Sequence, residues 1–374
     1  MALALTGEYQ ALARKYRPQT FDDVVGQKHV LGALSNAIDS KRIHHAYLLT
    51  GTRGIGKTTI ARIIAKCLEC EQGISAHPCG HCAACEGIAK GAYPDVIEID
   101  AASQTKVDDT RQLLENTQYP PVTGRYKIYI IDEVHMLSQS SFNALLKTLE
   151  EPPSYVKFIL ATTDPHKIPT TVLSRCLQFQ LKALTHDEIA SQIIKIAQNE
   201  QIPCENEAAQ LIARAAKGSM RDALSLTDQA IALGGGKIAR EAVLSMLGSA
   251  GDSLLLAILD SLLPQSKLTL EALLADIAAV SPNYRTLLEE LALALHDVAL
   301  FQFIGGSKLN VFSLPVNLLE QYAPRFGAQD LQLYYQICLE GLREYEYAPD
   351  GKSAFEMTVL RLHAFSPEKK KKIG

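Results

Sequence analysis

The sequence predicts an α/β domain built on a parallel sheet, followed by two regions that are entirely helical. In the first half of the chain, short apolar runs alternate with helical patterns, and these strand signals stop after about residue 183. The remainder is rich in leucine and alanine at helical spacing. With 374 residues, 47% hydrophobic and 21% charged, the composition is ordinary for a soluble globular chain of roughly two or three domains.

The predicted strands are short, apolar and separated by helical patterns, which is typical of parallel connections. They are AYLLT (46–50), DVIEID (95–100), YKIYIID (126–132) and KFILATT (157–163). Residues 1–183 are therefore expected to form the α/β domain.

The second region, 184–248, is predicted to be a small helical domain. It opens with Thr185 as a helix N-cap and Glu188 three residues later, a capping box ahead of apolar residues at helical spacing. The third region, 249–368, contains helices interrupted by prolines, and 369–374 is a basic tail. The many leucines of this third region fit either a bundle core or an oligomerisation surface, and their pattern does not decide between the two.

The net charge, the hydropathy and the cysteines indicate which partners and which cellular compartment are expected. The net charge of −4 does not favour nucleic acid, so any DNA contact must come from a local patch or from an assembly that collects several patches. No run reaches about 18 apolar residues, the length that spans a bilayer, and residues 1–30 lack the apolar core of a signal peptide. The cytoplasm is the expected location, and clustered cysteines there usually bind metal.

The loop GTRGIGKT (51–58) fits the pattern G-x-x-x-x-G-K-[ST] between an apolar strand and a helical run. Its backbone N–H groups would cradle phosphates, Lys57 would reach the β and γ phosphates, and Thr58 would ligate Mg²⁺. A purely structural glycine turn is the alternative, and the strand–helix context argues against it. The predicted nucleotide-binding residues of the loop are Gly51, Gly54, Gly56, Lys57, Thr58 and Thr59.

A second motif, IYIIDEVH (128–135), supplies the acids that nucleotide hydrolysis requires. The apolar strand ends in Asp132, which is expected near Mg²⁺, and in Glu133, which can polarise a water for attack on the γ phosphate. Two solvated acids are the alternative, which the presence of both motifs on one predicted sheet disfavours.

Several further segments carry a family resemblance. They are ARKYRP (13–18), TFDDVVGQ (20–27), IEIDAASQTKVDDTR (97–111), DEVHMLSQSSFNALLKTLEEPP (132–153), ATTDPHKIPTTVLSRC (161–176) and GSMRDALSLTDQA (218–230). Together with the phosphate loop, they resemble the tau/gamma subunits of the bacterial DNA polymerase III clamp loader, which are AAA+ ATPases. The resemblance extends through all three regions and is weakest in the third.

This resemblance implies roles for residues that the chemistry of the sequence would not have singled out. Thr163 matches sensor 1, which reads the γ phosphate, and Arg221 matches sensor 2 on the helical lid. Arg175, in SRC, matches the arginine finger that reaches the ATP of a neighbouring subunit. Without the resemblance, either arginine could be an ordinary surface residue. The segments near the N-terminus would border the adenine, through Tyr16, Pro18 and Val25.

The resemblance also implies contacts with DNA. Lys106 and Lys147 match basic positions that would face DNA phosphates, although solvated lysines are the alternative for both. Gln104 departs from the arginine that relatives often carry in this segment, which removes one expected phosphate contact.

Five of the eight cysteines lie between residues 67 and 85. Cys67 follows Ile60 and Ile64 at helical spacing and is expected on the buried face of its helix. This leaves C-x₈-C-x₂-C-x₂-C, a spacing that suits one tetrahedral Zn²⁺ with four thiolates and no open position. The predicted ligands, which the resemblance gives as well, are Cys70, Cys79, Cys82 and Cys85.

The predicted zinc site would crosslink an insertion at about 67–90 that is too short to have a core of its own. His81 is the rival ligand, and its place between two cysteines favours solvent exposure. Reduced cysteines in a core are the alternative to a metal site.

The expected function is that of an ATP-hydrolysing motor subunit that opens a sliding clamp and loads it onto primed DNA. By resemblance, its partners are other clamp-loader subunits, the clamp and primer–template DNA, with a homo-oligomer of the isolated chain as a further expectation. One rival is a scaffold that binds ATP without hydrolysing it, against which the intact Lys57, Asp132 and Glu133 argue. The other rival is a DExH helicase, for which a second motor domain is missing. Longer tau forms continue into a tail that binds polymerase and helicase.

Overall fold

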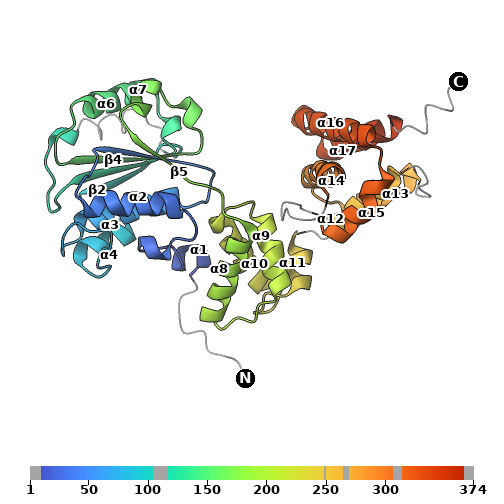
Figure 1. The fold of residues 1–374 in the computed structure, drawn as a ribbon, viewed down its shortest axis with the longest axis horizontal. Helices are drawn as coiled ribbons and strands as arrows, with labels where there is room; N and C mark the ends of the chain where they lie inside the picture. The colour runs from blue at the N-terminus through green and yellow to red at the C-terminus, as the bar shows by residue number, and fades with distance from the viewer. Residues whose placement is uncertain (1–9, 104–115, 248–249, 264–268, 306–313, 366–374) are drawn as a thin grey trace. The chain divides into compact units, whose positions relative to one another are not determined.

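The computed structural model describes residues 10–103, 116–247, 250–263, 269–305 and 314–365 (Figure 1). The chain divides into two units, Met1–Val243 and Leu244–Gly374. The first unit contains the α/β domain and the lid, and the second is helical throughout its described part.

The predicted parallel sheet is confirmed. Its five strands lie in the order β2-β3-β4-β1-β5, and every pairing is parallel. The strands are β1 (Ala46–Thr50), β2 (Val96–Asp100), β3 (Lys127–Asp132), β4 (Val156–Thr162) and β5 (Leu177–Gln180). The sequence predicted the first four, whereas β5 was missed. Because β4 lies between β1 and β3, the residues that follow these three strands meet at one edge of the sheet.

Helices cover both faces of the sheet (Figure 1). On one face, Leu34 of α2 (Lys28–Asp39) and Ile64 of α3 (Lys57–Glu69) pack in a core with Leu49. On the other face, Leu145 of α6 (Gln139–Glu150) packs with Leu48, beside the short α7 (Thr170–Leu173). Adjacent β1 residues thus serve opposite layers, which explains why the whole strand is buried.

The segment between α3 and β2 forms the predicted insertion. It leaves α3 at Cys70, crosses a run of turns and ends in α4 (Ala83–Lys90), whose N-cap is Cys82. Shorter elements complete this domain: α1 (Leu12–Lys15), η1 (Phe21–Asp23), η2 (Asn116–Gln118), η3 (Val134–Met136) and η4 (Pro165–Lys167).

The lid begins as the sequence predicted. Thr185 caps α8 (His186–Asn199), its side chain accepting from the backbone N–H of Glu188 while the Glu188 carboxylate accepts from Thr185. The helices α9 (Asn206–Ala215), α10 (Met220–Leu233) and α11 (Arg240–Leu247) follow. Apolar faces of α8, α9 and α10 pack against one another, which holds the lid together.

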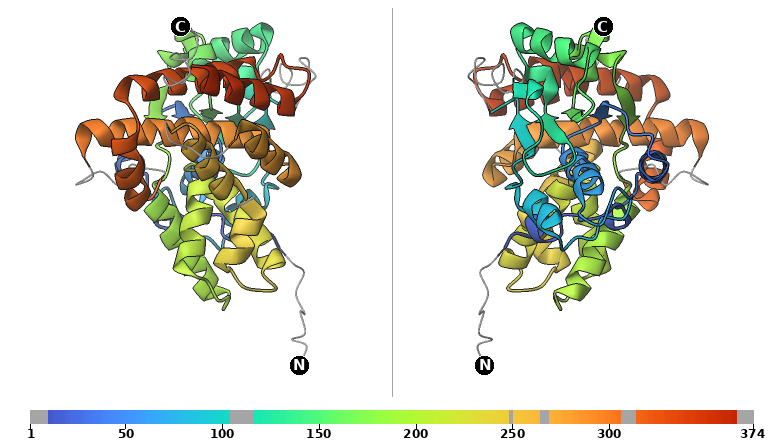
Figure 2. Two further views of the ribbon diagram at one scale, coloured as in Figure 1. Left: turned by 90° about the vertical axis from the view of Figure 1, so that its right-hand side faces the viewer. Right: turned by 90° about the vertical axis from the view of Figure 1, so that its left-hand side faces the viewer.

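The second unit contains α12 (Ala250–Ser261), α13 (Leu270–Val280), α14 (Tyr284–Ile304), α15 (Val316–Tyr322), η5 (Ala323–Arg325), α16 (Ala328–Glu344) and α17 (Gly351–Ala364). The helix α14 packs against α16 and α17 (Figure 2). Each α-helix contributes a fully buried leucine to one core: Leu259, Leu273, Leu291, Leu319, Leu331 and Leu362. A bundle core therefore accounts for these leucines, and the oligomerisation surface remains a prediction. In the described part of the chain, no helix has the length and apolar character needed to cross a membrane.

Candidate nucleotide site and cysteine cluster

The phosphate loop connects β1 to α3 at the carboxyl edge of the sheet. Gly54 and Gly56 adopt positive φ angles of 78° and 103°, which glycine reaches without steric cost. The Lys57 ammonium donates to the carbonyl oxygens of Gly51 at 2.9 Å and Thr52 at 3.0 Å. Burial lowers the pKa of Lys57, and the nearby carboxylates of Glu133 and Asp132 oppose this shift. The lysine is thus held inside the loop where a phosphate would lie.

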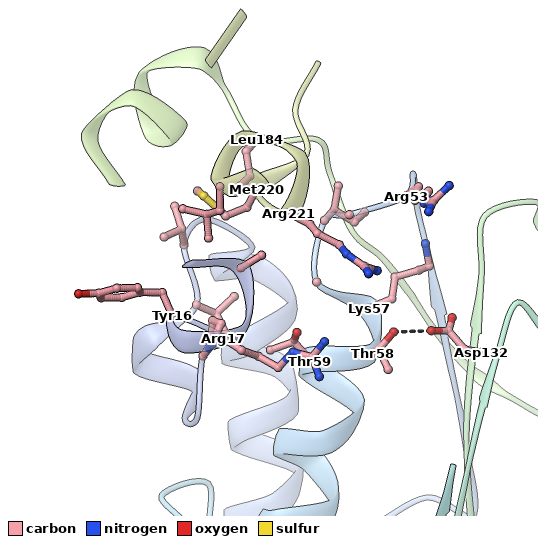
Figure 3. Close-up of a pocket in the computed structure, with 18 of the residues that line it drawn as sticks. Tyr16, Arg17, Arg53, Lys57, Thr58, Thr59, Asp132, Leu184, Met220 and Arg221 are labelled. Atoms are coloured by element: carbon pink, nitrogen blue, oxygen red, sulfur yellow. Dashed lines mark hydrogen bonds between the residues drawn. The ribbon is translucent and has the colours of Figure 1, made fainter. Parts of the chain in front are cut away.

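The predicted magnesium residues lie in contact. The Thr58 hydroxyl donates to the Asp132 carboxylate (Figure 3). A hydroxyl and a carboxylate are oxygen ligands of the kind that Mg²⁺ prefers beside nucleotide phosphates. The two side chains come from α3 and from the end of β3, so the donor set fits the ion.

Glu133 and Thr163 also meet, because they follow the neighbouring strands β3 and β4. One Glu133 carboxylate oxygen accepts from the Thr163 backbone N–H at 3.1 Å and from its hydroxyl at 2.8 Å. A ring nitrogen of His135 lies 3.5 Å from the same oxygen and 2.9 Å from the Thr162 hydroxyl. The predicted base and the predicted sensor 1 therefore touch each other in this structure.

A cavity of about 430 Å³ opens above the phosphate loop (Figure 3). Of the predicted site residues, it is lined by Tyr16, Pro18, Val25, Gly54, Gly56, Lys57, Thr58, Thr59, Asp132, Glu133 and Arg221. Lining residues that the sequence did not suggest include Arg17, Arg53, Asp100, Leu184, Gln192 and Met220. Arg17 lies between Tyr16 and Pro18, two residues that the sequence already placed near the adenine, and this position could have identified it as a lining residue. Gly51, Thr163 and Arg175 lie outside the lining.

The lid is docked directly on the phosphate loop. The backbone N–H of Arg221 donates to the Gly54 carbonyl at 3.3 Å. A Cβ added at Gly54 would lie 1.9 Å from the Ser219 hydroxyl oxygen, which is far inside any contact distance. Only glycine permits this approach, and the loop and the start of α10 consequently form one wall of the cavity.

The N-terminal segment is tied to the lid through Glu200, which follows α8. The Tyr16 hydroxyl and the Lys15 ammonium both donate to the Glu200 carboxylate, the ammonium at 2.8 Å. Burial and the bond to Glu200 raise the pKa of Tyr16 to about 12. Figure 3 shows the Tyr16 ring directed away from Lys57 and Thr58. The Tyr16 hydroxyl therefore binds the lid through Glu200, and the contact of Tyr16 with adenine remains a prediction.

The remaining predicted residues lie apart from the cavity. Arg175 donates to the Glu150 carboxylate at 2.9 Å and to the Thr171 carbonyl at 2.7 Å. Lys147 is exposed on α6. Lys106, like Gln104, lies outside the described residues.

The four predicted zinc ligands are brought together. The sulfur atoms of Cys70, Cys79, Cys82 and Cys85 all lie within 4.8 Å of one another, and sulfurs about 2.3 Å from one tetrahedral Zn²⁺ would be roughly 3.8 Å apart. Backbone N–H groups of the last three each donate to the sulfur of the preceding cysteine at 3.4 Å. Four cysteine sulfurs this close together can bind one ion, so the cluster fits zinc.

The other two candidates for this cluster are accounted for. Cys67 is fully buried, and its thiol donates to the Ala76 carbonyl at 3.6 Å. The His81 ring nitrogen pairs with the Cys79 carbonyl at 2.8 Å, and the side chain is exposed. Neither belongs to the sulfur cluster.

A parallel sheet with β4 between the loop-bearing β1 and the acid-bearing β3, covered at that edge by a helical lid, is the arrangement of the AAA+ class of P-loop ATPases. Three family models match the chain in succession. Residues 26–185 match "DNA polymerase III, delta subunit", 188–236 "DNA polymerase III clamp loader subunit, ATPase lid domain" and 238–373 "DNA polymerase III subunits gamma and tau domain III".

Individual relatives agree with these models. The chain is 54% identical to DNA polymerase III subunit tau of Escherichia coli over 96% of this chain and 56% of that protein. It is 46% identical to DNA polymerase III subunit gamma of Buchnera aphidicola subsp. Baizongia pistaciae, over 95% of this chain and 96% of that protein. The chain belongs to the gamma/tau family of DNA polymerase III subunits. It spans little more than half the length of the tau relatives from Escherichia coli and Salmonella typhimurium.

Proposed function

We propose that this chain is the ATP-hydrolysing motor subunit of a replicative clamp loader, which opens a ring-shaped sliding clamp and places it on primed DNA. One observation carries the proposal. The Lys57 ammonium and the Thr58 hydroxyl at the start of α3 converge with the Asp132 and Glu133 carboxylates at the end of β3 around one cavity. This is the set of groups that phosphoryl transfer to water requires.

Each group has a distinct task. The Lys57 ammonium exchanges its carbonyl partners for the β and γ phosphates, and Thr58 and Asp132 hold Mg²⁺ beside them. Held by Thr58 and Asp132, Mg²⁺ would supply positive charge to neutralise the phosphate oxygens. Glu133 accepts a proton from the attacking water, for which it must point to the γ phosphate.

The sensor and finger residues would link hydrolysis to assembly. Thr163 reads the γ phosphate from the end of β4, and Arg221 reports it to the lid, whose α10 touches the phosphate loop. Arg175 lies away from its own cavity, with its guanidinium on Glu150. This placement supports a role in trans, in which Arg175 stabilises charge on the ATP of the next subunit.

The cysteine cluster is proposed to hold one structural Zn²⁺. Four thiolates complete a tetrahedral shell, so the ion crosslinks the insertion and takes no part in hydrolysis. The site is joined to the ATPase core because the Arg125 guanidinium donates to the Cys70 carbonyl at 2.8 Å, while the Glu69 carboxylate accepts from the backbone N–H of Arg125 at 2.9 Å.

The proposed partners are the other clamp-loader subunits, the clamp and primer–template DNA, and replication places the assembly in the cytoplasm. The proposed domains are an ATPase domain (1–183), a lid (184–248) and an oligomerising collar (249–368). Lys147, exposed on α6, is the described candidate for a DNA phosphate contact. A helicase is disfavoured because the described part of the second unit is helical and contains no strand that could lead into a second phosphate loop.

The test is steady-state ATP hydrolysis by the purified chain, alone and assembled with candidate loader subunits, clamp and primed DNA. We expect hydrolysis that rises with assembly and DNA, and that disappears in Lys57→Ala together with ATP binding. ATP binding without hydrolysis in the complete assembly would instead support the scaffold that binds nucleotide without turning it over.

A further inference from the structure

We propose that Arg17 binds the α-phosphate of the nucleotide and thereby contributes equally to the affinity for ATP and for ADP. The inference deepens the proposed function, because it requires that the cavity above the phosphate loop takes a nucleoside triphosphate. It assigns a ligand to the phosphate that hydrolysis leaves unchanged.

The position of Arg17 carries the first step. Arg17 and Thr59 both line the cavity, and Figure 3 shows the Arg17 side chain running toward Thr59 in the first turn of α3. The preceding residues, Lys57 and Thr58, serve the β and γ phosphates and Mg²⁺. Phosphate oxygens also meet the backbone N–H groups of this first turn. A guanidinium beside Thr59 therefore meets the phosphate nearest the ribose.

The chain direction supports the same assignment. Tyr16 and Pro18, the neighbours of Arg17, line the same cavity and are the residues predicted to border the adenine. A side chain that starts at the adenine end and reaches the first turn of α3 crosses the space between base and phosphate loop. The α-phosphate is the nucleotide group that occupies that space.

Electrostatics supply a second, independent reason. Nearby Arg62 has its own partner in Glu98, to which it donates at 2.8 and 2.9 Å. Within the part of the chain that the structure describes, no hydrogen bond or ion pair engages the half-buried Arg17 guanidinium. Burial and the charges of Arg62, Arg221 and Arg14 lower its pKa, and Glu98 only partly opposes them. An unneutralised cation among other cations favours an anion at this place.

The backbone of Arg17 is preorganised for this role. Glu200 holds Lys15 and Tyr16, and the backbone N–H of Leu12 donates to the Asp228 carboxylate of α10 at 2.9 Å. The segment is thereby fixed to two helices of the lid. A cation on an anchored segment loses less conformational entropy when it binds a phosphate. A guanidinium can also donate two parallel hydrogen bonds to phosphate oxygens.

The decisive experiment compares Arg17→Gln with Arg14→Gln, a matched change at the exposed neighbouring arginine on α1. Competition against a fluorescent ATP analogue in the presence of Mg²⁺ gives the affinities for ATP, ADP and adenosine. We expect Arg17→Gln to weaken ATP and ADP by the same factor, about tenfold or more, while adenosine binding is unchanged. Arg14→Gln should match the parent for all three.

The other outcomes overturn the inference. A loss confined to ATP would move Arg17 to the γ phosphate, an equal loss for adenosine would move it to the base or ribose, and unchanged affinities would remove it from the site. If the parent chain itself fails to bind ATP, the proposed function fails, and this outcome is distinct from parental binding that Arg17→Gln leaves intact.

Thermal melting separates binding from a structural role. Without nucleotide, Arg17→Gln should melt no lower than the parent, because the substitution removes repulsion with Arg62 and Arg221 and breaks no hydrogen bond. With saturating ADP, the parent should gain more in melting temperature than the variant gains at the same ADP concentration. A variant that melts lower without nucleotide would show that Arg17 stabilises the fold, against the inference.

Discussion

Glu133→Gln isolates the proposed base from every other function of the site. In the structure, one carboxylate oxygen of Glu133 accepts two hydrogen bonds from Thr163, at 3.1 and 2.8 Å. The glutamine carbonyl oxygen can accept the same two bonds, so the side chain keeps its place and the fold its stability. What disappears is the ability to take a proton from water, which typically contributes 10²–10⁴ in rate, or about 3–5 kcal/mol in barrier height.

The assay pairs two measurements on the same preparation of Glu133→Gln. Equilibrium ATP binding should stay within about twofold of the parent, because Lys57, Thr58 and Asp132 are intact, while single-turnover hydrolysis should fall by the factor above. Thr163→Ser is the matched control, since serine retains the hydroxyl donor. Parental hydrolysis in Glu133→Gln would refute the assignment of the base, and a large loss of ATP binding would refute the separation of binding from chemistry.

Three further predictions concern the other parts of the site. Elemental analysis should find about one zinc per chain, reduced in Cys82→Ser and unchanged in Cys67→Ala; equal zinc in all three proteins would exclude the thiolate site. Arg175→Ala assemblies should lose turnover by a factor on the order of 10³–10⁵ with little change in ATP affinity, and adding chains inactivated at the phosphate-loop lysine should restore part of that turnover. Turnover at the parental rate would refute the assignment of Arg175 as an arginine finger, and an inactive variant that no mixture rescues would show that Arg175 acts on the ATP of its own chain. Gly54→Ala should weaken nucleotide binding and the docking of the lid, because the added Cβ would lie 1.9 Å from the Ser219 hydroxyl oxygen. Gly91→Ala has a similar positive φ but open space around the added Cβ, so it should lose only about 1–2 kcal/mol of unfolding free energy to backbone strain. Equal effects of the two changes would show that the clash is unimportant.

The sequence predicted the parts of the fold that local patterns determine. The three central strands β1, β3 and β4 were predictable because both of their faces are covered, which leaves continuous apolar runs such as β1. The start of the lid was predictable because Thr185 and Glu188 form their capping box locally. The edge strand β5 was not, since three of its four residues are exposed and its place depends on backbone pairing with β1.

Within the site too, local sequence motifs were predictable and tertiary contacts were not. The residues around Lys57 and Asp132 belong to motifs whose spacing encodes the chemistry. The contact between Glu133 and Thr163 and the use of Glu200 to anchor Tyr16 depend on tertiary packing across 30 and 184 positions of sequence. No local pattern distinguishes such pairs from solvated side chains.

The central claim is that ATP hydrolysis in this chain drives the loading of a ring onto DNA. It is tested most directly by assembling the chain with loader subunits and measuring the transfer of a fluorescent clamp to primed circular DNA. The account predicts that clamps become stably closed around DNA only when hydrolysable ATP is present, and that an assembly carrying Glu133→Gln binds ATP and clamp but does not complete loading. Equal loading by the Glu133→Gln assembly, or by the parental assembly without ATP, would contradict it.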